Sequence, residues 1–191
     1  MRRLVATEYL TLDGIMEAPG SETSLGERGG WSFLFSSDDH RQFKWEELLA
    51  SDALLLGRTT YEIFAASWPS RTGEFADRMN SLPKYVVSST LNNVEWNHSH
   101  LISNTTHLVE EILKLKQQPG LDILLTGSAE LFHALRERNL IDEYHFMVYP
   151  IIVGRGKRLF KEGNRIPLNL VKSQMLSSGV AVLIYHPYAT V

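Results

Sequence analysis

Short apolar runs alternate with amphipathic segments along the first three quarters of the chain, and this alternation constrains the fold more than any other feature. The runs cover residues 4–12, 53–56, 84–88 and 123–126, and each has the length of a buried strand. The segments between them predict helices, which we place around Phe43–Ala50 and at 60–66, 106–117 and 129–138. A regular succession of strands and helices predicts an α/β fold.

The last quarter follows a different pattern. Residues 143–149 alternate as a strand does, and 168–176 and 180–186 are separated by Ser-Ser-Gly, a hairpin signal. We therefore predict a mixed, mostly parallel central sheet with helices on both faces and an antiparallel C-terminal hairpin.

Bulk properties narrow the class of protein. The 191 residues show no repeat or linker, so we expect one domain over 1–191. A formal net charge of −3 gives no general basic field for nucleic acid or an anionic membrane. The chain has no apolar run of the ~18 residues that span a bilayer, no signal-like N-terminus and no cysteine. These features predict a cytoplasmic protein without nucleic-acid or membrane partners and without thiolate metal sites.

Glycines and hydroxyl residues collect where three expected strands end. The three junctions are Gly57-Arg58-Thr59-Thr60, Ser88-Ser89-Thr90 and Thr126-Gly127-Ser128. Ligands of open α/β sheets bind beyond the carboxyl ends of the strands. Three such junctions at equivalent positions of one sheet predict a shared ligand site.

The first junction, in "LLLGRTTYEIF", allows two interpretations. Thr59 and Glu62 fit a capping box at a helix start, which would explain both residues structurally. The box leaves Gly57 and Arg58 unexplained. A glycine permits close approach of a ligand, an arginine adds bidentate charge, and free helix amides favour an anion. Both interpretations, a structural helix start and a phosphate-binding site, stay open here.

The other two junctions are also ambiguous when taken singly. Ser88-Ser89-Thr90 suits the start of a loop or the donors around a 2′-phosphate, and no acidic residue follows before Glu95, so a bound dinucleotide would be of the NADP type. Ser128 suits an ordinary N-cap or a pyrophosphate site. The G-x-G of residues 154–156 does not open a helix, which excludes the Rossmann fingerprint.

In this order the motifs resemble the dihydrofolate reductase superfamily. They are most similar to the RibD C-terminal-domain group, the reductase half of bacterial riboflavin-pathway deaminase-reductases, over nearly the whole chain. The matching segments are "TLDGIM", "LLLGRTTYE", "VVSSTL", "LLTGSAEL" and, most specifically, "LIDEYHFMVYPIIVGRGKRLF".

The resemblance implies NADPH as the cofactor and assigns residues to it. Asp13, Gly14 and Ile15 would border the nicotinamide and the substrate. The residues that would hold the cofactor phosphates are Gly57, Arg58, Thr59, Thr60, Ser88, Ser89, Thr90, Thr126, Gly127, Ser128, Ala129 and Glu130. Ser128 stands where folate reductases have a second glycine.

The catalytic acid is less well defined by the resemblance. "DHRQFK" is similar to the D-x-x-x-F-K helix of folate reductases and nominates Asp39, with Asp13 as a second candidate. The spacing from Asp39 to the Gly57 motif is longer than in folate reductases. The alternative is a solvated carboxylate at a helix start.

The implied reaction is hydride transfer from NADPH to a small heterocyclic substrate, pyrimidine- or pteridine-like. The alternative is a relative of the same fold that binds a nucleotide without turnover. Trp31, Phe33, Phe35 and Trp68 could line the substrate pocket, or pack in the core. The resemblance also implies a homodimer through the C-terminal strands, whose apolar edge needs cover.

Two further clusters have simpler explanations. Arg155, Lys157 and Arg158 could anchor an acidic substrate, but a solvated turn is the simpler interpretation. His98 and His100 would share one face of a strand, and we interpret them as surface residues rather than metal ligands.

Overall fold

The computed structural model describes residues 1–20, 24–103, 107–161, 163 and 165–188. They form two compact units. Unit 1 comprises Met1–Ala6 and Lys44–Asp142, and unit 2 comprises Thr7–Phe43 and the chain from Glu143 onward. Strand β1 (Leu4–Thr11) and helix α1 (Asp38–Leu49) each contribute residues to both units.

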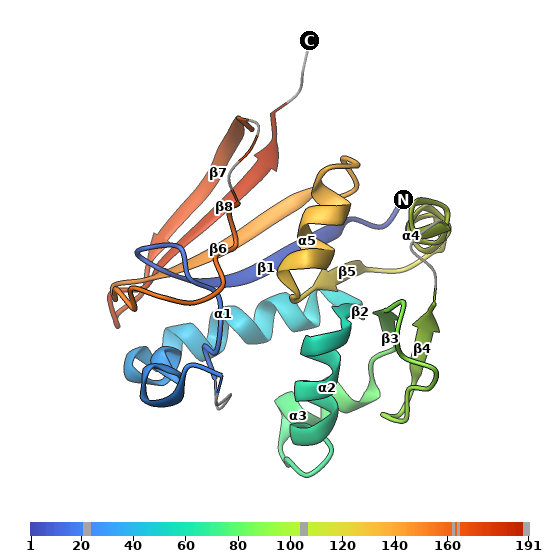
Figure 1. Cartoon of the computed structure of the whole chain (residues 1–191), viewed down its shortest axis with the longest axis horizontal. Helices are drawn as coiled ribbons and strands as arrows, with labels where there is room; N and C mark the ends of the chain where they lie inside the picture. The colour runs from blue at the N-terminus through green and yellow to red at the C-terminus, as the bar shows by residue number, and fades with distance from the viewer. Residues whose placement is uncertain (21–23, 104–106, 162, 164, 189–191) are drawn as a thin grey trace. The chain divides into compact units, whose positions relative to one another are not determined.

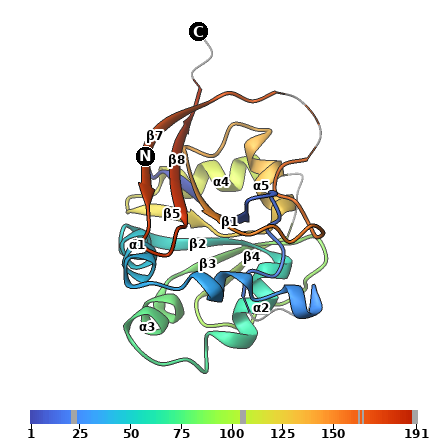
Figure 2. The same ribbon diagram turned by 90° about the vertical axis from the view of Figure 1, so that its left-hand side faces the viewer.

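Unit 1 is built on parallel strands in the order β4-β3-β2-β5-β1. Helices α4 and α5 cover one side of these strands, and α2 and α3 cover the other (Figures 1 and 2). The elements are β2 (Ser51–Gly57), α2 (Arg58–Ser67), α3 (Glu74–Ser81), β3 (Lys84–Val87), β4 (Ser99–Ile102), α4 (Leu108–Gln117), β5 (Asp122–Leu125) and α5 (Ala129–Arg136).

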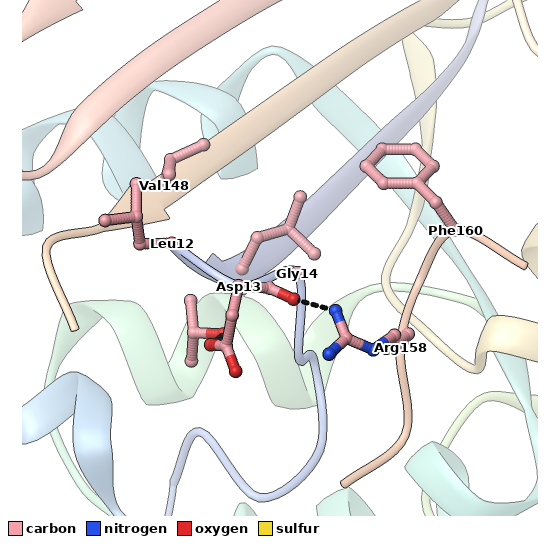
Figure 3. Close-up of a pocket in the computed structure, with 8 residues that line it drawn as sticks. Leu12, Asp13, Gly14, Val148, Arg158 and Phe160 are labelled. Atoms are coloured by element: carbon pink, nitrogen blue, oxygen red, sulfur yellow. Dashed lines mark hydrogen bonds between the residues drawn. The ribbon is translucent and has the colours of Figure 1, made fainter. Parts of the chain in front are cut away.

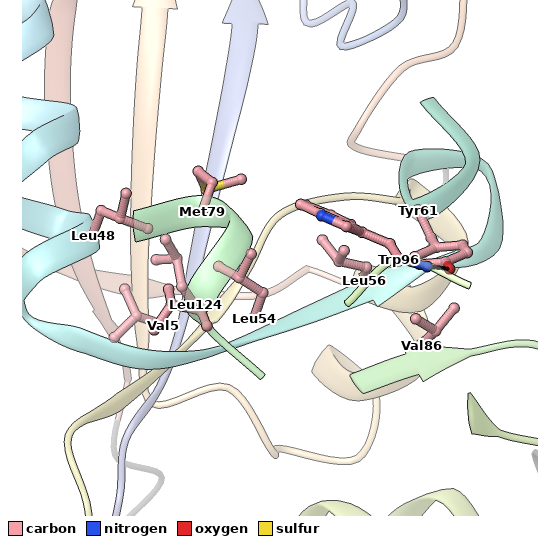
Figure 4. Close-up of a cluster of buried hydrophobic side chains, with 10 residues drawn as sticks. Val5, Leu48, Leu54, Leu56, Tyr61, Met79, Val86, Trp96 and Leu124 are labelled. Carbon is pink, nitrogen blue, oxygen red and sulfur yellow. Dashed lines mark hydrogen bonds between the residues drawn. The ribbon is translucent and has the colours of Figure 1, made fainter. Parts of the chain in front are cut away.

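The core of unit 1 explains why its strands are so apolar. Side chains from β2, β3 and β5 meet those of α1, α2 and α3, as Figure 4 shows. Leu54, Leu56 and Val86 are at most 1% exposed. Complete burial of such a side chain stabilises the fold by ~1.5–3 kcal/mol. Tyr61 adds a polar link, since its hydroxyl accepts a hydrogen bond from the Trp96 amide at 3.1 Å.

Unit 2 is antiparallel at its C-terminal end. Its strands follow the order β1-β6-β8-β7, with β6 (Glu143–Tyr149), β7 (Leu168–Met175) and β8 (Ala181–Pro187). Both β6 and β7 pair antiparallel with β8. The short 3-10 helices η1 (Gly26–Arg28) and η2 (Trp31–Phe35) precede α1. The predicted mixed sheet, with its C-terminal hairpin, is confirmed.

Strand β7 lies at the edge of the sheet and exposes apolar side chains. Leu170, Val171 and Met175 are 54% to 69% exposed. The homodimer implied by the resemblance would cover this edge, and it stays a prediction.

Several boundaries differ from those expected. Helix α2 begins at Arg58 rather than Thr60, and the predicted helix 106–117 is observed from Leu108, with residue 106 outside the described residues. Helix α3 was not expected, and a strand near β4 was considered only for His98 and His100; both elements are short. In the part of the chain that the structure covers, no helix is both long enough and apolar enough to cross a membrane.

Candidate functional site

The three glycine- and hydroxyl-rich junctions lie side by side in unit 1. The parallel register pairs Leu55 with Leu125 and Gly57 with Val87, so β5, β2 and β3 end at the same edge of the sheet. The Gly57 amide donates to the Gly127 carbonyl oxygen at 3.2 Å. The three junctions therefore lie at one edge of the sheet, and the first and third touch. That they form one site for a cofactor stays a prediction.

Two glycines allow the first and third junctions to touch. A Cβ atom on Gly57 would lie 3.0 Å from the Ser128 backbone nitrogen and closer still to the Ser128 hydroxyl. A Cβ atom on Gly127, where φ is +50°, would lie 2.5 Å from the Thr60 hydroxyl. Side chains at either position would push the two junctions apart. The Gly127–Ser128 peptide bond is cis.

Neither helix at these junctions has a side-chain cap. Gly57 precedes α2 and Ser128 precedes α5, and neither helix start has a side-chain hydrogen bond to its amides. The predicted capping box is wrong, because α2 begins at Arg58, which places Thr59 inside the helix. Glu62 instead pairs with Arg58, whose Nη1 lies 3.0 Å from its carboxylate. The first-turn amides of both helices are suited to an anion.

The hydroxyl residues of the second junction differ in what they contact. Ser88 is buried, and its Oγ accepts hydrogen bonds from the amides of Thr90 and Leu91 at 3.1 and 3.0 Å. It thus stabilises the turn after β3, as the loop-start interpretation proposed. Ser89 and Thr90 are exposed and can offer their hydroxyls to a ligand.

The remaining residues of the third junction differ in what they can offer. Ala129 is buried, Thr126 is half-buried and Glu130 is exposed. A phosphate would be repelled by the Glu130 carboxylate, so only the backbone amide of this residue suits the predicted contact.

Residues Asp13 to Ile15 lie in unit 2, beside a cavity of about 350 Å³. The cavity is lined by Leu10, Thr11, Leu12, Asp13, Gly14, Val148, Arg158 and Phe160 (Figure 3). Figure 3 also shows the Arg158 guanidinium donating to the Asp13 carbonyl oxygen. The Ile15 side chain is 1% exposed and packs with Ala18 and Leu25, so it is a core residue in this structure.

The Asp13 carboxylate organises the neighbouring backbone. It accepts hydrogen bonds from the Thr11 hydroxyl at 2.6 Å and from the amides of Val153 and Gly154 at 3.3 and 2.9 Å. Desolvation raises the pKa of Asp13, but these hydrogen bonds outweigh it and leave the pKa below its ordinary value. The Asp13 carboxylate thus holds the backbone of residues 153 and 154 in place, and its catalytic role stays a prediction.

Asp39 also has a structural role. Its carboxylate accepts hydrogen bonds from the hydroxyl of Ser37 at 2.5 Å and from the amide and hydroxyl of Ser177 at 2.7 and 2.9 Å. The hydrogen bond from Ser37 and then those from Ser177 lower the pKa of Asp39 to about 2. Such a carboxyl group is ionised at neutral pH, and the hypothesis that Asp39 is the catalytic acid stays a prediction.

We expect Asp39→Asn to destabilise the protein in a pH-dependent way. The pKa of Asp39 is about 2 in the folded protein, below its ordinary 3.8, so the ionised side chain favours the folded state above pH 3.8. This contribution is lost as the pH falls towards 2. Urea unfolding at several pH values should show a deficit for the variant at pH 6 that shrinks on acidification. An equal deficit at all pH values would contradict the assignment, and Asp38→Asn, at an exposed neighbour, is the control.

The candidate pocket aromatics do not act together. Trp31 and Phe35 pack against Tyr149 in unit 2, whereas Trp68 packs against Phe75 in the core of unit 1. Phe33 is 63% exposed. Only the first two therefore border a common aromatic cluster.

That cluster contains three polar residues that sequence reasoning missed. The Nε2 atom of His40 lies 3.0 Å from the Tyr9 hydroxyl and 3.2 Å from the Tyr149 hydroxyl. The signal in the sequence was weak: His40 follows Asp39 directly, and the two tyrosines are on strands 31 and 109 residues away.

In the basic cluster noted in the sequence, Arg158 lines the cavity described above. The Lys157 amide donates to the Glu17 carboxylate at 2.7 Å, and Arg155 is exposed. His100 stacks on Tyr85 with ring centroids 5.4 Å apart. Among the residues that the structure describes, no group of three His, Cys, Asp or Glu side chains is placed to hold a metal ion.

Known protein structures share this fold. The chain aligns over 98% of its length with a putative riboflavin biosynthesis protein from Shewanella sp. PV-4, at 20% identity, TM-score 0.69 and 99% coverage of that chain. It aligns with Enterococcus faecalis dihydrofolate reductase complexed with NADP(H) at 16% identity and TM-score 0.64, covering 98% of this chain and 97% of the reductase. The predicted dihydrofolate reductase-like fold is confirmed.

A bifunctional protein and two bacterial relatives extend the comparison. The diaminohydroxyphosphoribosylaminopyrimidine deaminase/5-amino-6-(5-phosphoribosylamino)uracil reductase of Thermotoga maritima matches 98% of this chain and 57% of its own, at 15% identity and TM-score 0.65. Bacillus subtilis (strain 168) protein YyaP is 30% identical over 191 residues, 97% of this chain and 95% of YyaP. YwjB of the same strain is 29% identical over 111 residues, 58% of this chain and 59% of YwjB.

The sequence model of the RibD C-terminal domain matches residues 2–182. This match covers nearly the whole chain and agrees with the motif order, the sheet and the three adjoining junctions. The chain therefore belongs to the RibD C-terminal domain family.

Proposed function

We propose that the protein is an NADPH-dependent reductase that transfers a hydride to a small pyrimidine- or pteridine-like substrate. The observation that supports it best is the contact between the starts of α2 and α5, held together by Gly57 and Gly127. Two uncapped helix N-termini at the ends of adjacent parallel strands make a strong site for phosphate groups.

The residues of unit 1 suit the phosphates of NADPH in particular. The amides at the start of α5 fit a pyrophosphate, and Arg58 at the start of α2 adds a cation that can bind bidentately. Ser89 and Thr90 offer hydroxyls for the 2′-phosphate, at a strand end where a ribose-binding carboxylate is absent from the sequence up to Glu95. When bound, NADPH would supply the hydride.

The substrate class is supported by the proteins that share the fold. The Thermotoga protein is named as a uracil-type reductase, and the Enterococcus protein reduces dihydrofolate, a pteridine. Both names describe reduction of a nitrogen heterocycle. Conserving this chemistry is the simplest proposal for a chain of the same family.

Titration of the purified protein with NADPH tests the proposal. We expect saturable binding with a dissociation constant of ~1 μM to 1 mM, and binding of NADH that is ~10-fold weaker or more, because the 2′-phosphate makes charge-assisted hydrogen bonds. A panel of pteridine, pyrimidine and flavin-like acceptors then tests turnover. Absence of NADPH binding at millimolar concentration would refute the reductase.

One observation favours the alternative of a binding protein without turnover. Both carboxylates nominated as acids, Asp13 and Asp39, are engaged by hydrogen-bond donors and have lowered pKa values. Tight NADPH binding without oxidation in the presence of any acceptor of the panel would select this alternative.

A further inference from the structure

One imidazole nitrogen connects two tyrosines in unit 2. His40, in the first turn of α1, places Nε2 3.0 Å from the hydroxyl oxygen of Tyr9 on β1 and 3.2 Å from that of Tyr149 on β6. The rings of Tyr9 and Tyr149 are 5.2 Å apart, centroid to centroid. We call this chain of side chains, Tyr149–His40–Tyr9, the His40 relay.

The relay is buried at one end and accessible at the other. Tyr149 is 0% exposed and packs edge-on against Trp31, with ring centroids 5.0 Å apart. Tyr9 and His40 are half-buried. The accessible end can therefore meet both a ligand and solvent, while the buried end fixes the orientation of the imidazole.

The position of the relay relates it to the predicted nicotinamide segment. Tyr9 lies on β1 shortly before the Asp13–Gly14 turn, and the Trp31 indole donates to the Glu17 carbonyl oxygen at 2.9 Å. The same aromatic cluster thus contacts the loop that follows that turn. Through Trp31, the relay is therefore connected to the loop that follows residues 13–15.

Among the residues that the structure describes, Tyr9 and Tyr149 bring titratable hydroxyls from neighbouring strands within hydrogen-bond distance of His40. On its own helix, Asp39 directs its carboxylate to Ser37 and Ser177 rather than to the imidazole. Asp38 pairs with Arg41. The imidazole is the one group in this set that ordinarily changes its charge between pH 5 and 8.

We propose that the His40 relay supplies the proton that completes reduction of the substrate, an inference that rests on the proposed function. When a hydride adds to the carbon of a C=N bond, that carbon gains two electrons from the nicotinamide donor, and the π pair moves to nitrogen. The Tyr9 O–H bond breaks and its proton passes to that nitrogen. Nε2–H of protonated His40 then returns a proton to the Tyr9 oxygen, and solvent reprotonates His40.

Within the relay, the three residues have separate tasks. Tyr9 is the proposed catalytic residue, because its hydroxyl is the group that would touch the substrate. His40 carries the proton between solvent and Tyr9. Tyr149 is a positioning residue, since its buried hydroxyl holds Nε2 in place.

Variants of the full-length chain test the proposal, using the panel acceptor that gives the fastest NADPH oxidation. We expect Tyr9→Phe and His40→Asn to lower kcat by ~100-fold or more. Both should bind NADPH within about twofold of the wild-type constant, because neither side chain is among those proposed to hold the cofactor phosphates. Tyr149→Phe should lower kcat by less than about tenfold, because it removes only an orienting hydrogen bond.

The pH profile separates a proton relay from a structural role. The wild-type kcat should fall as the pH rises from 5 to 8, because His40 must be protonated. In His40→Asn this decrease of kcat with pH should be absent. Asp39→Asn is the matched control on the same helix turn and should keep the decrease of kcat with pH. The proposal is overturned if His40→Asn retains this decrease or if Asp39→Asn abolishes it.

A readout without an acceptor tests the relay directly. The imidazole NMR signal that disappears in His40→Asn should titrate at a different pH in Tyr9→Phe, and an unchanged titration would also overturn the proposal. Failure of the wild type to bind NADPH would instead remove the proposed function. Wild-type-like turnover by His40→Asn would remove the relay and leave the reductase assignment intact.

Discussion

Gly57→Ala is expected to weaken NADPH binding by ~10-fold or more and to lower the free energy of unfolding by ~1–3 kcal/mol. The added methyl group would lie 3.0 Å from the Ser128 backbone nitrogen and from Ser128 Cβ. Backbone cannot rotate away as a flexible side chain can. The starts of α2 and α5 must then separate, and the amides that would share the phosphates no longer converge.

A second substitution distinguishes this mechanism from general destabilisation. Ser128→Gly removes the Cβ and hydroxyl that the new methyl group meets, so Gly57→Ala combined with Ser128→Gly should recover part of both losses. Gly73→Ala, also in unit 1, is the control: its φ of +103° strains an alanine, but the added methyl meets no atom within 4 Å. It should lose stability and keep NADPH affinity. Equal NADPH binding by Gly57→Ala and the wild type would argue against the site.

Arg58→Gln is expected to weaken NADPH binding by ~10- to 100-fold, corresponding to the ~1.5–3 kcal/mol of a hydrogen bond to a charged group. Stability should change little. The Arg58–Glu62 pair is exposed on both sides, 48% and 46%, and exposed i,i+4 pairs contribute only ~0.3–0.5 kcal/mol. The loss of affinity can therefore be attributed to the cofactor contact, and isothermal titration at two salt concentrations measures it.

Glu62→Gln is the matched control for Arg58. It breaks the same ion pair but keeps the cation, and it removes a negative charge near the proposed phosphates. NADPH should bind at least as tightly as to the wild type. If both substitutions weaken binding alike, the ion pair itself, rather than the free guanidinium, organises the site. An unchanged affinity in Arg58→Gln would show that Arg58 does not contact the cofactor.

The junctions show how far local sequence patterns can be trusted. The apolar runs before Gly57, Ser88 and Thr126 predicted buried strands, and parallel strands end at one edge of a sheet, so the meeting of the junctions followed from general rules. The residue at which α2 begins did not follow from such rules. Gly57 packs against Ser128, 71 residues away, with extended backbone at φ −78° and ψ 160°, and the helix begins directly after it. The T-x-x-E pattern therefore does not mark the start of this helix.

For the residues that could handle the proton, long-range contacts matter more than local motifs. Asp39 was nominated by a local motif, yet its carboxylate is satisfied by Ser177 in the β7–β8 turn, a contact across 138 residues. His40, one position further on, contacts tyrosines from two different strands. Neighbouring residues of a helix point in different directions, so one register position separates a structural carboxylate from a candidate relay.

By itself, the sequence determined most of the succession of strands and helices, the antiparallel end, the family and the three junctions rich in glycine and hydroxyl residues. These features depend on hydrophobic periodicity and glycine placement, which act over a few residues. Only the tertiary structure decided which helix ends are uncapped, which carboxylates are already engaged and which imidazole meets two hydroxyls. Those properties depend on side chains brought together from distant strands, and hydrogen bonds of that kind leave no local pattern in a single sequence.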